Sequence, residues 1–552
     1  MEEVTRRIIR IRSAPGVLHV FSPFELLEDA RTLGAKWNKK ERSWDVCATV
    51  GGVRRIIEVF GHHEIAGDQG YKDLLSAVRV ASEATYCKEA SVEELEQPEV
   101  RGTQAWLHQV RGYHFARRIK ACLLAMAMGT GKSKAAIDIM QNSGGSRFLI
   151  LCPKSVVGVW PDEIARHAAK EWNHAVLSLD KGSVKKRMET IKKKLDAARD
   201  APAIVVLNYE SAWREPMASL LLSTRWNVVV FDESHRIKAP QGKASKFCAS
   251  LFSVSDKRIG LTGTPLPHSP LDAFGQFRAL DPGIFGKSFA SFRARYAVMG
   301  GFGGHEVMGF QNTKDFYEKF YSITYRVSKD VLDLPEFTHV TRKCELEPAA
   351  RKVYKSLESD FWAGIGAGEI TATNALVKLI RLAQLTGGTL LTDDGKEVEV
   401  SSAKKALLGE VMEDMEIEEP VVVFARFRKD LDRIAETAAK LGRKSYELSG
   451  RRNELKLWQE DTTGSVLAVQ EQAGGVGISL VRARYCIYYS VGYSLGDYEQ
   501  SLARIHRPGQ SRGVLYVHLL AEQSIDEAVY AALDARRDVV EAILEGRTKG
   551  EK

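Results

Sequence analysis

The sequence lacks any long apolar run. No segment approaches the roughly 18 unbroken apolar residues of a membrane-spanning helix, and the opening stretch MEEVTRRIIRIR has no signal-peptide pattern. The seven cysteines are scattered, without the C-x-x-C spacing that is typical of zinc sites and redox motifs. These absences argue against a membrane protein and against a disulfide-rich secreted protein. We expect a protein of the reducing cell interior.

What the chain does have is length and a balanced composition. Its 552 residues exceed the ~250 to 300 at which single cores stop growing, so we expect two large lobes and a smaller unit. With 44% hydrophobic and 27% charged residues, the chain can bury a core and is unlike a disordered protein. The formal net charge of +8 is compatible with binding a polyanion, although many basic proteins bind none.

The order of apolar runs predicts how the chain is organised. Residues 1–95 are predicted to form a small separate unit, with the acidic stretch 89–100 leading out of it. Beyond it, short apolar runs alternate with amphipathic helical stretches, which is typical of parallel sheets with crossover helices. The first set of predicted strands lies at 148–152, 203–207, 227–231 and 258–261, and the second set at 420–427, 465–469, 485–489 and 514–520.

We therefore predict an α/β protein with two parallel-sheet lobes, helical insertions and a small α+β N-terminal domain. The predicted boundaries place the first lobe, with a helical insertion, at 96–345, a helical linker at 346–400 and the second lobe at 401–552. The last helix should dock on the second lobe through an apolar face. That face consists of Ile525, Ala528, Val529, Ala532 and Leu533.

A glycine-rich segment of the first lobe predicts a phosphate-binding loop. The segment AMGTGKS (127–133) lies between a strand and a helix, where glycines let backbone N–H groups approach phosphate oxygens. Lys132 would reach the β- and γ-phosphates, and the Ser133 hydroxyl would bind Mg²⁺. Met126 stands where the strict motif has glycine, so a helix start with a solvated lysine stays open for this segment taken alone. The predicted nucleotide-binding residues here are Gly129, Thr130, Gly131, Lys132 and Ser133.

An acidic pair follows the apolar run NVVVF. Asp232 and Glu233 come at the carboxyl end of this predicted strand, where open α/β sheets place their nucleotide sites. Asp232 can hold Mg²⁺, and Glu233 can orient and deprotonate an attacking water. Acidic residues often follow strands, but together with the GKS segment of the same lobe they predict nucleotide hydrolysis.

The motifs of the first lobe resemble those of the Swi/Snf branch of superfamily-two helicase-like ATPases. DESH (232–235) resembles the DExH box, with Ser234 where relatives have alanine, and LTGTPL (261–266) resembles the third motif. WLHQVRGYHFA resembles the glutamine motif, which implies that Gln109 reads adenine. CPKSVVGVW (152–160), LNYES and DPGIFG are similar to further segments of this family.

This resemblance has consequences for ligands and for DNA contacts. It implies two tandem RecA-like lobes that use ATP and Mg²⁺. It also implies that Pro153, Lys154 and Ser155 border a DNA track. Thr262 and Thr264, which we include among the DNA-binding residues, would relay the nucleotide state to that track.

The run QSLARIHRPGQ (500–510) predicts a phosphate contact from the second lobe. Its spacing predicts that Gln500, Arg504 and Arg507 lie on roughly one side of a helix. The run is similar to the family's sixth motif, which implies that Gln500 contacts the nucleotide and that both arginines reach the transition-state phosphoryl group from across a cleft. VQEQAGGVGISL (469–480) is similar to the fifth motif, and Gly475 within it is predicted to approach the nucleotide.

We therefore predict an ATP-dependent translocase on double-stranded DNA, with remodelling of branched DNA or displacement of bound proteins as open extensions. A strand-separating DNA or RNA helicase, or an ATP-switched nucleic-acid-binding module, stays open as an alternative. We expect a monomer without membrane attachment. The compact motor, without extra reader modules, favours the cytoplasm of a prokaryotic cell or phage-infected host, and a nuclear location stays open.

The N-terminal unit has its own candidate DNA surface. LGAKWNKKERSWDV (33–46) combines Trp37 and Trp44 with several lysines and an arginine, a mixture that can stack on bases and contact phosphates. It resembles the HARP-type modules of fork-remodelling annealing helicases, which engage branched DNA. The alternative, a small domain with core tryptophans and a solvated hairpin, stays open.

Overall fold

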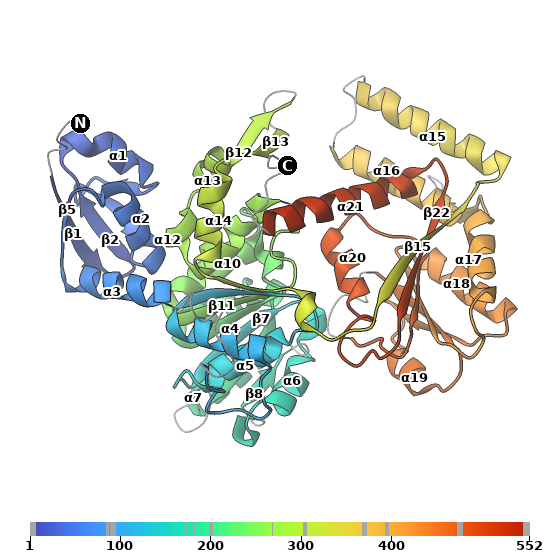
Figure 1. Ribbon diagram of the computed structural model, residues 1–552, viewed down its shortest axis with the longest axis horizontal. Coiled ribbons are helices and arrows are strands. Elements are labelled where there is room, and N and C mark those ends of the chain that lie inside the picture. Colours follow the sequence, from blue (N-terminus) through green and yellow to red (C-terminus); the bar gives the residue numbers. More distant parts are fainter. Residues whose placement is uncertain are drawn as a thin grey trace. The chain divides into compact units, whose positions relative to one another are not determined.

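The computed structural model of the protein describes residues 7–83, 88, 95–172, 175–179, 183–197, 202–267, 269–301, 306–366, 372–391, 397–471 and 478–544. The contacts within the chain divide it into two compact units, one of residues 1–331 and 543–552 and the other of residues 332–542. The first unit holds the N-terminal domain and the first lobe, and the second unit holds the second lobe (Figure 1).

The N-terminal domain is a five-stranded mixed sheet with three α-helices. Its elements are β1 (Ile8–Ala14), β2 (Val17–Phe21), α1 (Leu27–Thr32), β3 (Lys36–Asn38), β4 (Ser43–Cys47), α2 (Val50–Phe60), β5 (Glu64–Gly67) and α3 (Gln69–Glu83). The strand order is β3-β4-β2-β1-β5, and only β1 and β5 among the paired strands run parallel. Alternate residues of β1 and β2 enter the core, as expected for strands with one buried face. The predicted small α+β domain is confirmed.

The first lobe is a seven-stranded sheet in which all pairings are parallel. Its order is β14-β6-β11-β10-β7-β9-β8. The strands are β6 (Ala121–Met126), β7 (Arg147–Cys152), β8 (Val176–Ser178), β9 (Ala203–Asn208), β10 (Trp226–Asp232), β11 (Ser255–Thr262) and β14 (Thr324–Val327). The central strands are buried apolar runs, which is why the sequence predicts them.

Helices connect and extend this sheet. The crossover and flanking helices are α4 (Leu107–Arg118), α5 (Lys132–Gln141), α6 (Trp160–His167), α7 (Val184–Asp196), α8 (Tyr209–Ala212), α9 (Met217–Ser223) and α10 (Lys243–Ser250). The predicted insertion comprises α11 (Ala273–Leu280), α12 (Pro282–Phe285), α13 (Phe289–Tyr296), the hairpin of β12 (Ala297–Gly300) and β13 (Glu306–Phe310), and α14 (Thr313–Tyr321). Phenylalanine and tyrosine rings from α11 to α14 pack on one another and form its core.

The second lobe is a six-stranded sheet in which all pairings are again parallel. Its order is β15-β22-β21-β18-β20-β19. The strands are β15 (Phe337–Cys344), β18 (Val421–Ala425), β19 (Ser445–Leu448), β20 (Val466–Gln470), β21 (Tyr485–Tyr488) and β22 (Val514–Ala521). β15 precedes the predicted lobe boundary at residue 345, yet it pairs along its whole length with β22. Two parallel-sheet lobes, as predicted, are thus confirmed.

Helices of the second lobe precede, cover and end its sheet. They are α15 (Pro348–Gly366), α16 (Ala372–Gly387), α17 (Ala403–Glu413), α18 (Arg428–Lys440), α19 (Leu455–Glu460), α20 (Leu495–Leu502) and α21 (Ile525–Leu544). A short hairpin of β16 (Thr389–Leu391) and β17 (Glu397–Glu399) follows α16. Val529 and Leu533 of α21 are buried and Ile525 is half-buried, which confirms part of the predicted apolar face of the last helix, whereas Ala528 and Ala532 are exposed and do not belong to it.

Glycines bring the N-terminal domain and the first lobe into close contact. α2 packs against α12, and a Cβ atom on Gly51 would lie 2.6 Å from Cγ1 of Ile284. A Cβ atom on Gly283 would lie 2.3 Å from the backbone nitrogen of Gly52. Asp281 holds both sides, since its Oδ1 accepts from the Gly283 N–H (2.8 Å) and its Oδ2 from the Gly51 N–H (3.2 Å). We call this contact the glycine seam.

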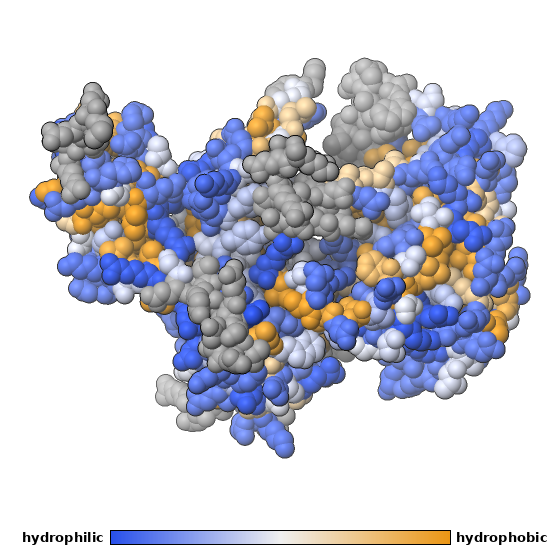
Figure 2. All heavy atoms as spheres, in the orientation of Figure 1, coloured by the Kyte–Doolittle hydropathy of each residue, from blue (hydrophilic) through white to orange (hydrophobic). Residues whose placement is uncertain are grey.

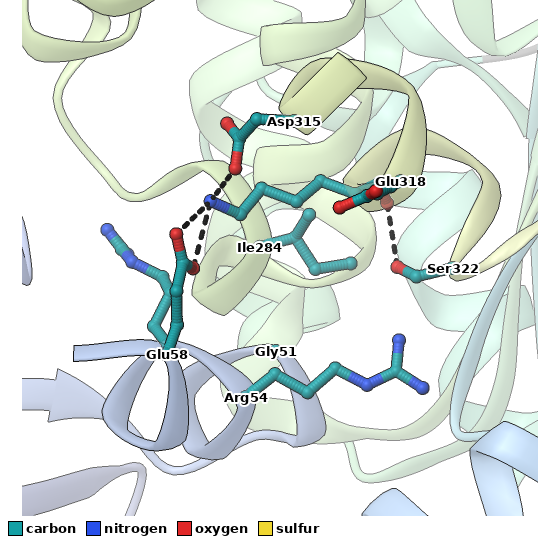
Figure 3. Close-up of a pocket in the computed structure, with 9 residues that line it drawn as sticks. Gly51, Arg54, Glu58, Ile284, Asp315, Glu318 and Ser322 are labelled. Carbon is teal, nitrogen blue, oxygen red and sulfur yellow. Dashed lines mark hydrogen bonds and ion pairs between the residues drawn. The ribbon is translucent and has the colours of Figure 1, made fainter. Parts of the chain in front are cut away.

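Ion pairs continue the contact beside the glycine seam, around a cavity of about 330 Å³ (Figure 3). Glu58 of α2 lies 3.1 Å from Nζ of Lys319 and 3.2 Å from a guanidinium nitrogen of Arg295. Asp315 of α14 pairs with the same two cations, at 2.7 and 3.0 Å. The N-terminal domain is therefore fixed to the first lobe by shape and by charge.

The surface is largely polar. Figure 2 shows hydrophilic side chains over most of the visible face, with apolar residues in separate patches. Within the described residues, no helix is long and apolar enough to cross a bilayer.

Replacing Gly51 by alanine should destabilise the first unit, because the added methyl group would meet the backbone nitrogen of Ile284 at 2.7 Å. We expect a loss of about 1 to 3 kcal/mol in the free energy of unfolding, as is typical of overpacked contacts. Urea unfolding measures it. Gly309→Ala is the matched control, because no described atom lies within 4 Å of the new Cβ. Equal stability of the Gly51 variant and the unmodified chain would contradict a tight glycine seam.

Candidate functional site

The loop from Ala127 to Gly131 joins the carboxyl end of β6 to the first turn of α5. Gly129 (φ +84°) and Gly131 (φ +80°) adopt the left-handed backbone that favours glycine. Lys132 begins α5, and its Nζ donates to the carbonyl oxygen of Met126 at 3.0 Å. A helix N-terminus carries N–H groups without helical partners and favours anions. This segment, which we call the phosphate loop, has a backbone and a charge suited to phosphate even though Met126 breaks the strict motif, and its contact with a nucleotide stays a prediction.

Gln109 supports the phosphate loop from α4. Its Nε2 donates to the carbonyl oxygen of Thr130 at 3.0 Å, and its Oε1 accepts from the backbone N–H of Trp106 at 2.9 Å. Nε2 of His108 lies 2.8 Å from the same Thr130 oxygen. A Cβ atom on Gly131 would lie 2.1 Å from Nε2 of Gln109. Gln109 therefore packs directly on the loop, and its predicted contact with adenine stays a prediction.

The acidic pair lies at the carboxyl end of β10, the central strand of the sheet. Asp232 and Glu233 are only 7% and 4% exposed, so both carboxylates are held out of water. Oδ1 of Asp232 accepts from the Glu233 N–H at 2.9 Å. Glu233 has the left-handed φ of +48°, which is strained for a residue with a side chain and is a feature of many functional sites. Its Oε2 lies 3.4 Å from Nδ1 of His235 and accepts no hydrogen bond from the described residues.

The electrostatics of this pair favour a bound cation. Burial raises the pKa of Asp232, the neighbouring Glu233 raises it further, and the charge of Lys132 acts in the opposite direction. A buried carboxylate oxygen without a donor, beside a second buried carboxylate, fits a divalent cation or a polarised water. Among the described residues there is no cluster of three or more His, Cys, Asp or Glu side chains that could hold a metal. Mg²⁺ commonly uses one or two carboxylates with substrate phosphates, so Asp232 fits it, and the predicted contribution of the Ser133 hydroxyl stays a prediction.

Two aromatic residues, which the sequence analysis did not single out, position Asp232. Nε1 of Trp160 donates to Oδ2 of Asp232 at 3.0 Å, and the Tyr209 hydroxyl donates to the backbone carbonyl of Asp232 at 2.8 Å. Both side chains are buried. They belong to CPKSVVGVW (152–160) and LNYES (207–211), which are similar to family motifs, but that resemblance implies no role for these rings.

The threonines of the third motif lie behind the acidic pair. Thr262 is fully buried, and its Oγ1 lies 3.1 Å from Nδ1 of His235 and accepts from the Thr264 N–H at 3.1 Å. The Thr262 hydroxyl therefore faces the interior, and a direct contact with DNA is not available to it in this conformation. The relay of nucleotide state through Thr262 and Thr264 stays a prediction.

The predicted DNA-border residues lie just beyond β7. Lys154 and Ser155 belong to a 3₁₀ turn, Lys154–Val156, and both side chains are exposed, whereas Pro153 is buried. This turn ends at the same carboxyl edge of the sheet as the acidic pair, since β7 and β10 are parallel neighbours.

The structure corrects the predicted helix of the sixth motif. Gln500 lies on α20, but this helix ends at Leu502, and Arg504 and Arg507 follow in turns. Pro508 keeps Arg507 out of a helix, because proline disfavours helical backbone at the residue before it and cannot donate a backbone hydrogen bond, but it does not account for the end of α20 at Leu502. The prediction that the three residues share one face of a helix is therefore wrong, although all three come within one short segment.

The turns of the sixth motif are nevertheless well fixed. A guanidinium nitrogen of Arg507 donates to the carbonyl oxygen of Ile478 at 3.0 Å, and Nε2 of Gln510 donates to the carbonyl oxygens of Val481 and Ala483. Gln500 and Arg504 are 2% and 4% exposed. Gly475 lies outside the described residues. The contact of Arg504 and Arg507 with a nucleotide stays a prediction.

The phosphate loop and the buried acidic pair on one parallel sheet, followed by a second parallel sheet, define a helicase-like ATPase. Residues 55–387, more than half of the chain, match the SNF2-related domain, and residues 403–509 match the helicase conserved C-terminal domain. The chain belongs to the SNF2-related family. This confirms the predicted enzyme class, a DNA-dependent, helicase-like ATPase of the Swi/Snf type.

Similar proteins differ greatly in length. The chain is 26% identical over 456 residues to "Putative protein p41" of Acyrthosiphon pisum secondary endosymbiont phage 1, covering 77% of this chain and 95% of that protein. It is 23% identical to the Danio rerio chromodomain-helicase-DNA-binding protein 1-like, over 77% of this chain and 42% of that protein. It is 24% identical to the Mus musculus DNA annealing helicase and endonuclease ZRANB3, over 82% of this chain and 42% of that protein. It therefore spans less than half of these two animal relatives.

Solved structures that are similar to the chain share a slightly lower sequence identity with it than the relatives above. The Sulfolobus solfataricus SWI2/SNF2 ATPase core in complex with dsDNA is 22% identical, covers 82% of this chain and 95% of its own, and has a TM-score of 0.39.

Replacing Gly131 by alanine should weaken nucleotide binding at least tenfold. The new methyl group would meet Nε2 of Gln109 and would add the strain of a left-handed alanine, about 1 to 2 kcal/mol. Titration with a fluorescent ADP analogue measures the change. Gly144→Ala shares the positive φ (+70°), but no described atom lies within 4 Å of its Cβ, so it separates the strain from the clash. Unchanged affinity in the Gly131 variant would contradict the phosphate-loop assignment.

Proposed function

We propose that this ATPase is a translocase that moves on double-stranded DNA. The observation that carries the proposal is the buried Asp232–Glu233 pair at the carboxyl edge of the first sheet, the same edge at which the phosphate loop follows β6. Such a pair hydrolyses a phosphoanhydride, and a chain of the SNF2-related family with a second lobe can convert the hydrolysis into movement.

The proposed site residues of the first lobe each have a defined part in this chemistry. The phosphate loop and Lys132 bind the phosphates of ATP, with Ser133 and Asp232 as ligands of Mg²⁺. Mg²⁺, when bound, neutralises charge on the phosphoryl oxygens. Glu233 orients the attacking water and accepts its proton, for which its Oε2, which accepts no hydrogen bond from the described residues, is suited.

Trp160 and Tyr209 hold Asp232 in place while the site works. Each donates one hydrogen bond to it from a buried ring. A site built from fixed side chains loses less free energy in reorganisation during the reaction.

The second lobe completes the cycle in this proposal. Arg504 and Arg507 contact the transition-state phosphoryl group, and Gln500 contacts the nucleotide, so that hydrolysis depends on closure of the lobes. Alternating closure and opening moves the two lobes along the DNA backbone. A grip that consists mainly of phosphate contacts is largely independent of DNA sequence and weakens with salt.

Several features support DNA as the track. Lys154 and Ser155 are exposed at the edge of the sheet that carries the acidic pair. The names of similar proteins include DNA-binding and DNA annealing helicases. The phage origin of one relative, 95% of which this chain covers, supports action in a prokaryotic cytoplasm or a phage-infected host, where we propose that the protein is monomeric.

The N-terminal domain supports a preference for branched DNA. Trp37 of the β3–β4 hairpin is 44% exposed and packs edge to face on Trp44, with ring centroids 5.2 Å apart. Lys36, Lys39, Lys40 and Arg42 of the same hairpin are exposed. An exposed indole among cations can stack on an unpaired base while the cations contact phosphates. We propose that this hairpin engages the single-stranded part of a fork.

Duplex DNA should stimulate ATP hydrolysis by the full chain more strongly than single-stranded DNA or RNA at one fixed salt concentration. Glu233→Gln should lower the DNA-stimulated kcat about 10²-fold or more and retain nucleotide binding, because general-base catalysis contributes about 10² to 10⁴. Glu189→Gln, on an exposed residue of the same lobe, is the control. Stimulation by single strands or RNA alone would favour the strand-separating helicase. Regulated DNA binding without turnover would favour the ATP-switched module.

Trp37→Ala should raise the concentration of forked DNA needed for half-maximal stimulation about fivefold or more, since base stacking contributes ~1 to 3 kcal/mol. The value for linear duplex should stay unchanged. Phe24→Ala removes another exposed aromatic ring of the same domain, 85% exposed and outside the hairpin, and serves as the control. Equal effects on forked and linear DNA would overturn the fork-binding role of the hairpin.

A further inference from the structure

Ser234 and Gln276 form a polar pair inside the first lobe. Ser234 is 1% exposed and Gln276 is fully buried. The Ser234 hydroxyl donates to Oε1 of Gln276 at 2.8 Å. Nε2 of Gln276 in turn donates to the carbonyl oxygen of Pro265 at 2.6 Å and to that of Asp272 at 3.0 Å. Both polar atoms of the Gln276 amide group therefore have hydrogen-bond partners, which fix the orientation of the group.

The pair joins two loops of the active site. Ser234 directly follows Glu233, the proposed general base, on the loop after β10. Pro265 directly follows Thr264 on the loop after β11. A second bridge between the same loops runs from His235 to Thr262. The loop that carries Glu233 and the segment 262–266 are thus connected at two points through buried hydrogen bonds.

Packing alone does not account for a serine at this position. An apolar pair of similar shape can replace a buried hydrogen-bonded pair with little loss of stability. Oγ of Ser234 also lies 3.3 Å from where a Cβ of Gly260 would stand, so the hydroxyl is fitted closely over β11. A buried and fully directed hydrogen-bond chain specifies one arrangement of the groups that it joins.

We propose that Ser234 and Gln276 are positioning residues that transmit the nucleotide state of the Glu233 loop to the segment 262–266. When the Glu233 loop shifts between nucleotide states, the Ser234 hydroxyl carries Gln276 with it, and the Gln276 amide group moves the Pro265 carbonyl. This inference rests on the proposed function, because segment 262–266 would pass the signal on to the DNA track.

Ser234→Ala removes the first bond of this chain. Its matched control is Ser255→Ala, which removes another buried serine hydroxyl of the same lobe, one that donates to the Leu251 carbonyl at 2.7 Å at the opposite end of β11. Two quantities are measured in both variants. One is hydrogen–deuterium exchange of residues 262–266 with and without ADP and Mg²⁺, and the other is the ratio of DNA-stimulated to basal ATP hydrolysis.

In the unmodified chain and in Ser255→Ala, we expect ADP to change the exchange rate of residues 262–266. In Ser234→Ala this response should fall about fivefold or more, the factor to which one net hydrogen bond corresponds, and the stimulation ratio should fall with it. Thermal unfolding should show similar losses for both variants, so that stability alone does not explain the difference.

A response of residues 262–266 that persists in Ser234→Ala, or that is absent from the unmodified chain, overturns the inference. If DNA fails to stimulate the unmodified chain while the ADP response is present and is lost in Ser234→Ala, the translocase proposal fails and the positioning role stands. The exchange measurement needs no DNA, so the two failures are distinguishable.

Discussion

The first lobe is organised around two neighbouring carboxylates that are kept out of water at the end of one strand. Burial of charged oxygens is unfavourable unless they are hydrogen-bonded or paired. Here the indole of Trp160, the backbone N–H of Glu233 and the charge of Lys132 offset part of that penalty for Asp232, whose pKa nevertheless stays raised. Glu233 receives much less support and has a strained backbone. The lobe is thus rigid around the proposed metal ligand and leaves the proposed base available for a substrate water.

The parts of the fold with buried, unbroken apolar runs could be predicted from the sequence. The predicted strands at 148–152 and 227–231 correspond to β7 and β10, whose side chains are almost all buried. β15 gave no such signal, because it is an edge strand whose residues are exposed or half-buried throughout. Its assignment to the second sheet depends on pairing with β22, far along the chain, and no local pattern carries that information.

In the candidate site too, residues with a local sequence signal could be predicted, whereas residues that act through distant contacts could not. The phosphate loop and the acidic pair have strong local signals, because glycine, lysine and acidic residues follow predicted strands. Trp160 and Tyr209 had none, since a buried aromatic ring with a polar tip looks like ordinary core in a sequence. The helical spacing of Gln500, Arg504 and Arg507 was misleading, because Pro508 and the turns before it replace the last part of the expected helix.

The glycine seam has a consequence for how this protein can be recombined. Neither Gly51 nor Gly283 has room for a side chain, and Asp281 binds the backbone of both segments. An N-terminal domain from a relative will fit here only if its helix also has glycine where it faces residues 281–286. The N-terminal domain and the segment 281–286 therefore have to be exchanged together, although more than two hundred residues of sequence separate them. A chimaera that takes the domain from one protein and this segment from another would bring together two surfaces that are not complementary.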